Sequence, residues 1–379
     1  MLINKTNQNN SFFKCSPRVV AFYLPQYHPI PENNLWWGPG FTEWVNVVCA
    51  KPLFKGHKQP HIPADLGFYD LRLPDTRFAQ AELAKEAGIE GFCYWHYWFG
   101  NGKRLLERPF NEVVDTGNPD FPFCLAWANH SWFKKRWNPN SIGKDKLLIE
   151  QKYLGVKDYE EHFYALLKSF KDKRYLKVNG KLIFMIYAPL DFKDVPLFIE
   201  TWNKLAIKNG LDGFYFIGGQ YAGRYTDQIL SLGFDAVYNE SLMGIHARMS
   251  NIRKLFEIVQ TKYLKMPRRY RYSDAMKYFN SKAETEIFKI PGIKPNWDHT
   301  PRSKNNGTVF TGSTPELFYK HVRETIDLVK NKPKDNQLIF LKSWNEWGEG
   351  NYMEPDLEFG DGYIKALRKA IEDSKNHRN

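Results

Sequence analysis

Eight short apolar runs alternate with amphipathic helical patterns along most of the chain. Consecutive strand–helix units pair in parallel through right-handed crossovers, and eight of them close naturally into a barrel. We therefore predict an α/β fold, a (β/α)₈ TIM barrel. A doubly wound sheet is the alternative, although no Gly-rich turn follows the first run. The predicted strands are Val19–Leu24, Gly91–Trp95, Phe121–Trp127, Leu182–Tyr187, Phe214–Gly218, Ala236–Asn239, Ile287–Ile293 and Leu338–Trp344. The predicted helices are Asp75–Ala87, Leu105–Asp115, Asp158–Phe170, Pro196–Lys208, Asp227–Leu232, Pro315–Lys330 and Gly362–Ser374.

The composition of the 379 residues does not change along the chain, so we expect one barrel domain, 18–379, after a flexible N-terminal tail, 1–17. Insertions near 38–73 and 250–286 extend two of its loops. The tail is polar and Asn-rich and lacks the apolar segment of a secretory signal. No apolar run approaches the roughly 18–20 residues of a membrane span. These features predict a cytoplasmic protein.

The chain is basic, because 54 Lys and Arg against 42 Asp and Glu give a net charge of +12. An anionic neighbour is therefore expected. Within the second insertion, residues 253–271 hold seven basic residues and one acid, Glu257, with tyrosines between them. This segment is interpreted either as a solvated helical surface or as a patch that meets acidic glycan or a membrane surface. Nucleic acid is not expected, because no recognition motif accompanies the charge.

Polar and aromatic side chains gather where the predicted strands end. The carboxyl ends of the strands of a parallel barrel meet at one face, where the active site is built. Burying such polar groups unpaired would be costly, so a pocket explains them better than a core does. We predict that the following residues bind substrate: Gln26, His28, Trp95, His96, Trp127, Asn129, His130, Tyr187, Gln220, Asn239, Trp297, Asp298, Asn345 and Trp347.

The strongest single motif is Asn345-Glu346-Trp347-Gly348-Glu349-Gly350, directly after the last predicted strand. Its two carboxylates can both point into one cleft. Cleavage of a glycosidic bond needs such a pair, in which one group protonates the leaving oxygen and the other assists at the anomeric carbon. The motif therefore predicts Glu346 and Glu349 as catalytic residues. Two glutamates in a solvated loop are the alternative, which the flanking tryptophans disfavour.

Aromatic residues make up 16% of the chain, and of its twelve tryptophans only Trp202 lies in a predicted helix. The others gather in segments at the predicted mouth of the barrel. Sugar rings stack their C–H faces on indole and phenol rings, so the set favours a glycan, although any one tryptophan can equally pack in the core. We expect neither a metal nor a cofactor. His57 and His61 lie four residues apart, but Pro60 and Pro63 argue against a helix that presents both.

Several longer motifs lie in the same loops. They are Tyr23–Glu32, Trp36–Gly38, Gly40–Trp44, Pro60–Pro63, Trp127–Asn129, Trp297-Asp298 with Pro301-Arg302, and Trp344–Gly350. Together they resemble the WbsX-like family, which is related to glycoside hydrolase family 99. The resemblance extends from about Arg18 to the last predicted helix and adds Glu43, Trp44 and Arg302 to the predicted substrate-binding residues.

The resemblance implies a barrel that acts on glycosides without a metal. Glu346 would deprotonate the 2-hydroxyl of the sugar, which then attacks the anomeric carbon and forms a 1,2-anhydro sugar. Glu349 would act first as the acid and then as the base that activates water or an acceptor, with net retention. In one departure, the chain has His130 where the family pattern reads Trp-Ala-Asn-Glu. If that glutamate contacts sugar hydroxyls, His130 alters specificity.

Three functions stay open. The first is a retaining glycosidase or transglycosylase acting on a bacterial surface polysaccharide, O-antigen or capsule, or on its lipid-linked precursor. The second is a sugar-nucleotide glycosyltransferase of the same pathway, for which the chain shows no Gly-rich phosphate loop. The third is a non-catalytic glycan-binding barrel, which would keep the tryptophans but need not keep both glutamates.

Overall fold

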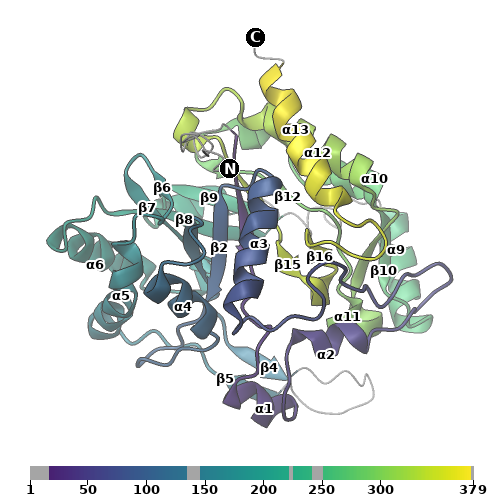
Figure 1. The fold of residues 1–379 in the computed structure, drawn as a ribbon, viewed down its shortest axis with the longest axis horizontal. Helices are drawn as coiled ribbons and strands as arrows, with labels where there is room; N and C mark the ends of the chain where they lie inside the picture. The colour runs from purple at the N-terminus through teal and green to yellow at the C-terminus, as the bar shows by residue number, and fades with distance from the viewer. Residues whose placement is uncertain (1–16, 135–145, 222–224, 241–250, 377–379) are drawn as a thin grey trace, which may run out of the picture.

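Nine parallel strands form a nearly closed barrel in the computed structural model, which describes residues 17–134, 146–221, 225–240 and 251–376 (Figure 1). The order around the sheet is β11-β9-β8-β7-β3-β2-β1-β14-β12. Every residue of β2 and β3 is buried, as expected for strands covered on both faces. The predicted barrel is confirmed. The strands are β1 (Arg18–Tyr23), β2 (Gly91–His96), β3 (Phe123–Trp127), β7 (Lys181–Ile186), β8 (Phe214–Tyr221), β9 (Ala236–Glu240), β11 (Lys289–Ile290), β12 (Gly292–Ile293) and β14 (Leu338–Leu341).

The predicted strand Ile287–Ile293 is formed in two short pieces. Its first piece, β11, pairs with β9, and its second piece, β12, pairs with β14. Pro291 lies between them and has no N–H group to donate to a neighbouring strand. Its carbonyl still accepts a hydrogen bond from the Phe340 N–H at 3.1 Å. The two pieces together fill one strand position and bring the ends of the sheet together.

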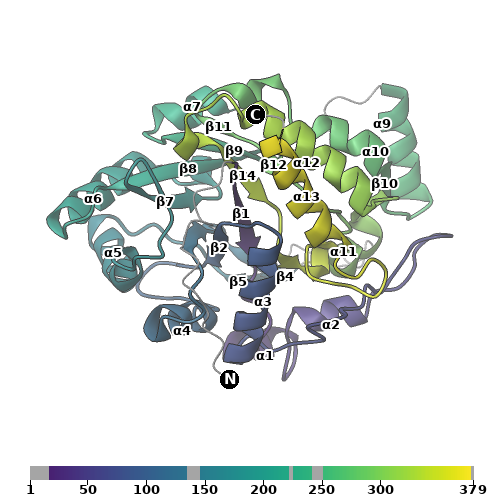
Figure 2. The same ribbon diagram turned by 45° about the horizontal axis from the view of Figure 1, so that its top comes forward.

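The predicted helices form within a few residues of their expected bounds. The best-defined start is that of α12, where the Thr314 hydroxyl accepts a hydrogen bond from the Leu317 N–H and Pro315 occupies the first turn. Helices α12 and α13 lie side by side in both views (Figures 1 and 2). None of the helices in the described ranges is long and apolar enough to cross a bilayer. The helices are α3 (Pro74–Glu86), α4 (Arg108–Thr116), α5 (Val156–Phe170), α6 (Val195–Lys208), α7 (Thr226–Ser231), α12 (Pro315–Val329) and α13 (Gly362–Asn376).

The loops contain structure of their own. Helices α1 (Pro31–Trp37) and α2 (Glu43–Val48) follow β1, and the hairpin β4 (Trp132–Lys134) and β5 (Lys146–Ile149) follows β3 (Figure 1). The described part of the second insertion forms α9 (Asn251–Ile258), β10 (Arg268–Arg271) and α10 (Tyr272–Ala275). Strand β10 pairs in parallel with β13 (Thr308–Thr311). The insertion is therefore not only a helical surface. Residues 1–16 of the predicted tail lie outside the described residues.

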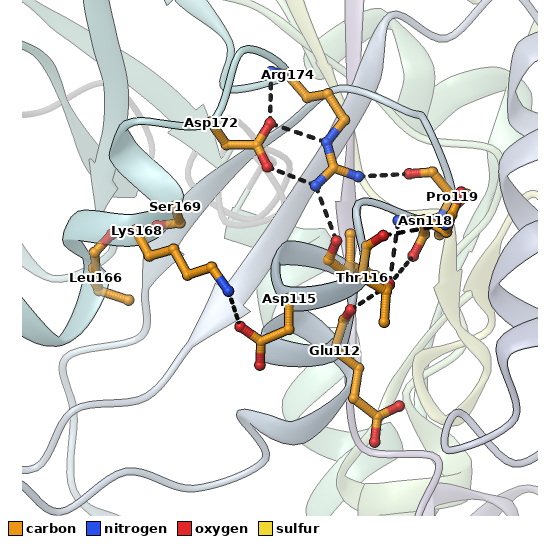
Figure 3. Close-up of polar contacts among 11 residues, drawn as sticks. Glu112, Asp115, Thr116, Asn118, Pro119, Leu166, Lys168, Ser169, Asp172 and Arg174 are labelled. Carbon is orange, nitrogen blue, oxygen red and sulfur yellow. Dashed lines mark hydrogen bonds and ion pairs between the residues drawn. The ribbon is translucent and has the colours of Figure 1, made fainter.

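Arg174 links segments that lie before β3 and after α5 through several polar contacts (Figure 3). Its guanidinium donates to the carbonyl oxygens of Pro119 at 2.8 Å and Val113 at 2.9 Å. It also forms an ion pair with Asp172, at 2.6 Å. A planar group with five N–H donors can satisfy all of these acceptors at once. The contacts join the turn after α5 to the end of α4 and to the loop before β3.

Candidate active site

A cavity of about 560 Å³ opens among the loops that follow the carboxyl ends of the barrel strands. In barrels of this kind those loops carry the reacting groups. The cavity is lined by residues from α1, α2, β2, the β4–β5 hairpin and α11 (Thr300–Ser303), and from the segments that follow β1, β3, β7 and β14. The lining residues are Leu24, Gln26, Asn33, Trp37, Phe41, Glu43, Asn46, Trp95, Tyr97, Ala128, His130, Ser131, Trp132, Phe133, Leu148, Tyr187, His299, Arg302, Lys342, Glu346 and Glu349.

Both motif glutamates line this cavity. The chain after β14 forms β15 (Asn345–Glu346), a 3₁₀ turn over Trp347–Glu349, and β16 (Asn351–Tyr352), which pairs back antiparallel on β15. Glu346 ends β15 and Glu349 ends the turn, so both carboxyls enter the cavity from one short hairpin. The indole N–H of Trp95 donates to Oε1 of Glu346 at 2.7 Å and fixes that carboxyl against β2.

The side chains next to the two glutamates fix the β15–β16 hairpin by hydrogen bonds to the rest of the protein. The amide oxygen of Asn345 accepts from the Leu24 N–H at 2.7 Å, which ties the hairpin to the end of β1. The indole N–H of Trp347 donates to the buried carboxyl of Glu354 at 2.6 Å. A side chain at Gly348 would meet Oε1 of Glu43, because a Cβ there would lie only 1.7 Å away. Glycine is therefore required for the close approach of α2 to the turn.

Arg302, on α11, bridges two carboxylates at the cavity wall. Its Nη1 donates to Oε1 of Glu349 at 2.5 Å, and its Nε donates to Oε1 of Glu43 at 2.7 Å. The Glu43 and Glu349 side chains are 2% and 12% exposed, so both ion pairs are largely shielded from water. His299 lies 3.7 Å from Glu349 through its Nε2. The electrostatic surroundings of the two catalytic candidates therefore differ.

The pKa values of the two carboxyls are driven in opposite directions. Burial raises the pKa of Glu346 above its usual range; Lys342 opposes this shift, and the charge of Glu349 adds to it. Burial also opposes the ionisation of Glu349, but Arg302, Lys342 and His299 outweigh it and hold the pKa of that carboxyl below its usual range. These surroundings favour the protonated form of Glu346 and the ionised form of Glu349.

The cavity brings together eight of the residues predicted from the sequence: Gln26, Glu43, Trp95, His130, Tyr187, Arg302, Glu346 and Glu349. They come from seven separate parts of the chain. The rings of His130 and Tyr187 lie 5.6 Å apart between centroids on one wall. Trp95 is stacked on the core ring of Phe22, with centroids 4.8 Å apart. Gln220 lies in β8, and its side chain is outside the described residues.

Ten predicted residues do not line the cavity: His28, Trp44, His96, Trp127, Asn129, Asn239, Trp297, Asp298, Asn345 and Trp347. Most of them bond within the wall behind it. Asn129 binds both backbone groups of the segment after β7, accepting from the Ala188 N–H at 2.7 Å and donating to the Ala188 carbonyl at 2.9 Å. Asp298 accepts from the His57 and Gln59 side chains. These polar groups are buried because protein partners satisfy them, which removes the need for a ligand.

Four more of the predicted residues that do not line the cavity bond to protein groups in the same way. The Trp44 indole donates to the Tyr69 carbonyl at 2.8 Å, and the Trp127 indole donates to the Trp98 carbonyl at 3.0 Å. His96 lies 2.7 Å from the His162 ring nitrogen on α5. Asn239 donates to Glu284 at 3.0 Å. Among the tryptophans that the structure describes, Trp37, Trp95 and Trp132 line the cavity. Most of the described tryptophans therefore pack behind the cavity, and only a few lie on the surface that a sugar would touch.

Several lining residues were not predicted: among them Trp37, Tyr97, Trp132, His299 and Lys342. Lys342 is the clearest omission, because a cation directly after the buried strand β14 is a signal visible in the sequence. It is 6% exposed, and its ammonium lies 5.8 Å from the Trp95 ring centroid and 5.5 Å from that of Trp297. His299 follows the predicted Asp298 directly. Among the described residues, no group of three or more His, Cys, Asp or Glu side chains is arranged to hold a metal ion.

Comparisons with known proteins agree with this architecture. An uncharacterized protein WxcX of Xanthomonas campestris pv. campestris is 34% identical over 360 residues, which are 93% of this chain and 49% of that protein. This chain thus spans about half of its curated relative. A glycoside hydrolase-like protein is 16% identical, with a TM-score of 0.59 over 93% of each chain. The GH99 endo-alpha-mannosidase from Bacteroides thetaiotaomicron is 14% identical, with a TM-score of 0.56 over 96% of this chain and 99% of that chain.

At these identities the two solved structures show that the fold is shared and nothing further. The sequence comparison goes beyond the fold, because a family model described as Glycosyltransferase WbsX matches residues 19–367. That range includes every strand of the barrel except the first residue of β1, and all the lining residues of the cavity. The chain therefore belongs to the WbsX family.

Proposed function

We propose that this protein is a carbohydrate-active enzyme that breaks and remakes a glycosidic bond with retention, using Glu346 and Glu349. The observation that supports this most directly is the pair itself: the buried carboxyl of Glu346 and the largely shielded carboxyl of Glu349 on one short hairpin, in a cavity, with pKa values driven in opposite directions. Pairs of titratable groups whose environments separate their pKa values are typical of acid–base catalysis. The proposed substrate is a glycan of a bacterial surface polysaccharide such as O-antigen or capsule, or its precursor.

The proposed reaction has two steps. Glu346 takes the proton of the 2-hydroxyl, whose oxygen bonds to the anomeric carbon while the bond to the leaving oxygen breaks and Glu349 protonates that oxygen. Water or an acceptor hydroxyl then attacks the anomeric carbon and gives its proton to Glu349, and the 2-oxygen recovers its proton from Glu346. Attack from opposite faces in the two steps retains the configuration. The first step requires an ionised Glu346 and a protonated Glu349, the reverse of what their surroundings favour without substrate. A sugar hydroxyl that donates to Glu346 stabilises its ionised form and so favours the arrangement that the step requires.

A second candidate is transfer from a sugar nucleotide, which the name of the matching family favours. Cationic side chains in the cavity, Lys342 and Arg302 above all, would suit a diphosphate group. The two candidates differ in the donor that they require. The protein is therefore incubated with candidate glycans in the presence and absence of sugar nucleotides, and the products are resolved by mass spectrometry.

We expect product without a nucleotide, and none with the Glu349→Gln variant. Product that forms only when a sugar nucleotide is present would overturn the first proposal in favour of the second. Glycan binding with no product under either condition would favour a non-catalytic barrel. The anomeric configuration of the first-formed product, followed by NMR, tests retention separately.

Replacement of Trp95 by phenylalanine tests whether the hydrogen bond from the Trp95 indole to Glu346 contributes to catalysis. The variant keeps a ring stacked on Phe22 but loses the N–H that donates to Glu346. A hydrogen bond to a charged group contributes about 1.5–3 kcal/mol, so kcat should fall roughly 10- to 100-fold with little change in KM. The control is Trp36→Phe, the same change at a residue that does not line the cavity. An unchanged kcat in Trp95→Phe would show that the contact does not support the reaction.

A further inference from the structure

Large apolar side chains are exposed on α9 and the turn that follows it. Between positions 255 and 264, six of them are at least 40% exposed. We call these six residues the α9 face: Leu255 (63%), Phe256 (53%), Ile258 (46%), Val259 (40%), Tyr263 (77%) and Leu264 (56%). Single exposed apolar residues are common on protein surfaces, but a contiguous group of them marks a site of interaction.

Among the side chains that the structure describes between residues 254 and 271, the charged ones that reach the solvent are all cationic. Lys262, Lys265 and Arg271 are exposed, and Lys254 and Arg268 are half-buried beside them. The acid of this segment, Glu257, is only 4% exposed, because it turns inward and accepts a hydrogen bond from the Tyr270 hydroxyl at 2.6 Å. The segment therefore presents apolar side chains and cations to the solvent without a neighbouring carboxylate of its own.

The α9 face is carried by a folded part of the protein. Strand β10 pairs in parallel with β13, and the Tyr272 hydroxyl donates to the Lys294 carbonyl at 2.5 Å. Tyr270, Tyr272 and Phe279 form a small buried cluster with Trp297 and Phe310. Both views show α9, α10 and β10 together at one edge of the molecule (Figures 1 and 2). The apolar side chains are thus held in place on a rigid base.

We propose that the α9 face docks the protein on the surface of an anionic membrane. An exposed apolar face bordered by Lys and Arg is typical of helices that lie in the plane of a bilayer interface, where the apolar chains enter the lipid and the cations meet acidic head groups. Nucleic acid or acidic glycan would use the cations but would leave the apolar side chains in water. A second copy of the chain would bring two sets of cations together, which costs electrostatic energy.

The position of the face relates membrane binding to the cavity. Strand β13, which holds β10, also bridges through Val309 to Asp298. The Asp298 N–H donates to the Glu349 carbonyl at 2.7 Å, and Arg302 follows on α11. The pairing of β10 with β13, and of β13 with Asp298, therefore connects the α9 face to the cavity wall that contains Glu349. A docked protein would hold its cavity near the bilayer, which suits a lipid-linked glycan; this last step rests on the proposed function, whereas membrane docking does not.

Co-sedimentation of the full chain with vesicles tests the docking. We expect binding to vesicles of phosphatidylcholine mixed with phosphatidylglycerol and little binding to phosphatidylcholine alone. Leu255→Asp/Phe256→Asp and Lys262→Glu/Lys265→Glu should each weaken binding by at least about tenfold. The matched controls change exposed residues elsewhere: Ile207→Asp/Leu357→Asp for the apolar pair and Lys320→Glu/Lys330→Glu for the charged pair. Circular dichroism and thermal unfolding check that every variant folds.

Three outcomes would overturn the proposal: no binding by the unaltered chain, equal binding to both kinds of vesicle, or equal loss in the controls. Self-association in analytical ultracentrifugation that disappears in Leu255→Asp/Phe256→Asp would assign the face to a second copy instead. Turnover of a water-soluble glycan should be unchanged in the docking variants. Membrane binding without any turnover would leave the docking intact and would count against the proposed function alone.

Discussion

Glu346→Gln and Glu349→Gln should each abolish turnover while the glycan still binds. Glutamine keeps the size and polarity of the side chain but neither accepts a proton as a base nor donates one as an acid. Loss of such a group lowers rates by about 10²–10⁴-fold. Initial rates measure turnover, and quenching of the fluorescence of Trp95 and the other cavity tryptophans measures binding. The two variants should lose activity to a similar degree, because the pair acts as a unit.

The control for both variants is Glu358→Gln, which alters an exposed carboxylate that pairs with Lys58 outside the cavity. It should retain the rate of the unaltered chain. A rate close to that of the unaltered chain in either cavity variant would remove that residue from the proposed mechanism. Loss of glycan binding together with turnover would instead assign the glutamate to substrate recognition.

Arg302→Met should destabilise the fold as well as the active site. The substitution leaves the carboxylates of Glu43 and Glu349 buried without the cation that bridges them. Breaking a buried ion pair on one side costs about 3–5 kcal/mol of unfolding free energy. Urea unfolding at neutral pH measures this cost. Arg72→Met is the matched control, because its pair with Asp70 is on the surface and is worth less than about 1 kcal/mol.

The cost of Arg302→Met should shrink as the pH falls. In the unaltered chain the pKa of Glu349 is held below its unfolded value, so this group adds stability above the unfolded pKa and loses it as the pH falls toward the folded pKa. Without the cation, burial raises the pKa of the same carboxyl, and the variant gains stability as the pH falls from neutral. Unfolding free energies at pH values on both sides of about 5 measure the change. A difference that does not depend on pH would show that the charge of Arg302 is not what stabilises this wall.

The barrel could be predicted from the sequence because its strands are buried on both faces and its helices are amphipathic. What could not be predicted is structure that depends on distant partners. Arg268–Arg271 has no apolar alternation, yet it forms β10 because Thr308–Thr311 lies beside it. The break of the seventh strand at Pro291 has a visible cause, but its two pieces find different neighbours only in the closed barrel.

The sequence could predict at which end of the barrel the candidate site lies. It could not predict which of the side chains at that end line the cavity. Successive residues of a strand point to opposite sides, so Trp95 enters the cavity while His96 points to His162 on α5. The period of two indicates that only one of these neighbours lines the cavity, without indicating which. Asn129 and His130 divide in the same way between the wall and the cavity. This uncertainty does not apply to the pair of Glu346 and Glu349. Glu349 lies in a turn rather than in a strand, so the alternation of a strand does not place the two carboxyls on opposite sides.

The break at Pro291 affects how the barrel can move. Only two residues on each side of it pair with a neighbouring strand, whereas β2 and β3 share five paired positions. Local opening of a protein begins where the fewest backbone hydrogen bonds must break. We therefore expect the closing seam to open more easily than the pairing of β2 with β3. The seam separates the insertion with the α9 face from the segment with Arg302. A small movement there would change the width of the cavity while the rest of the barrel stays closed.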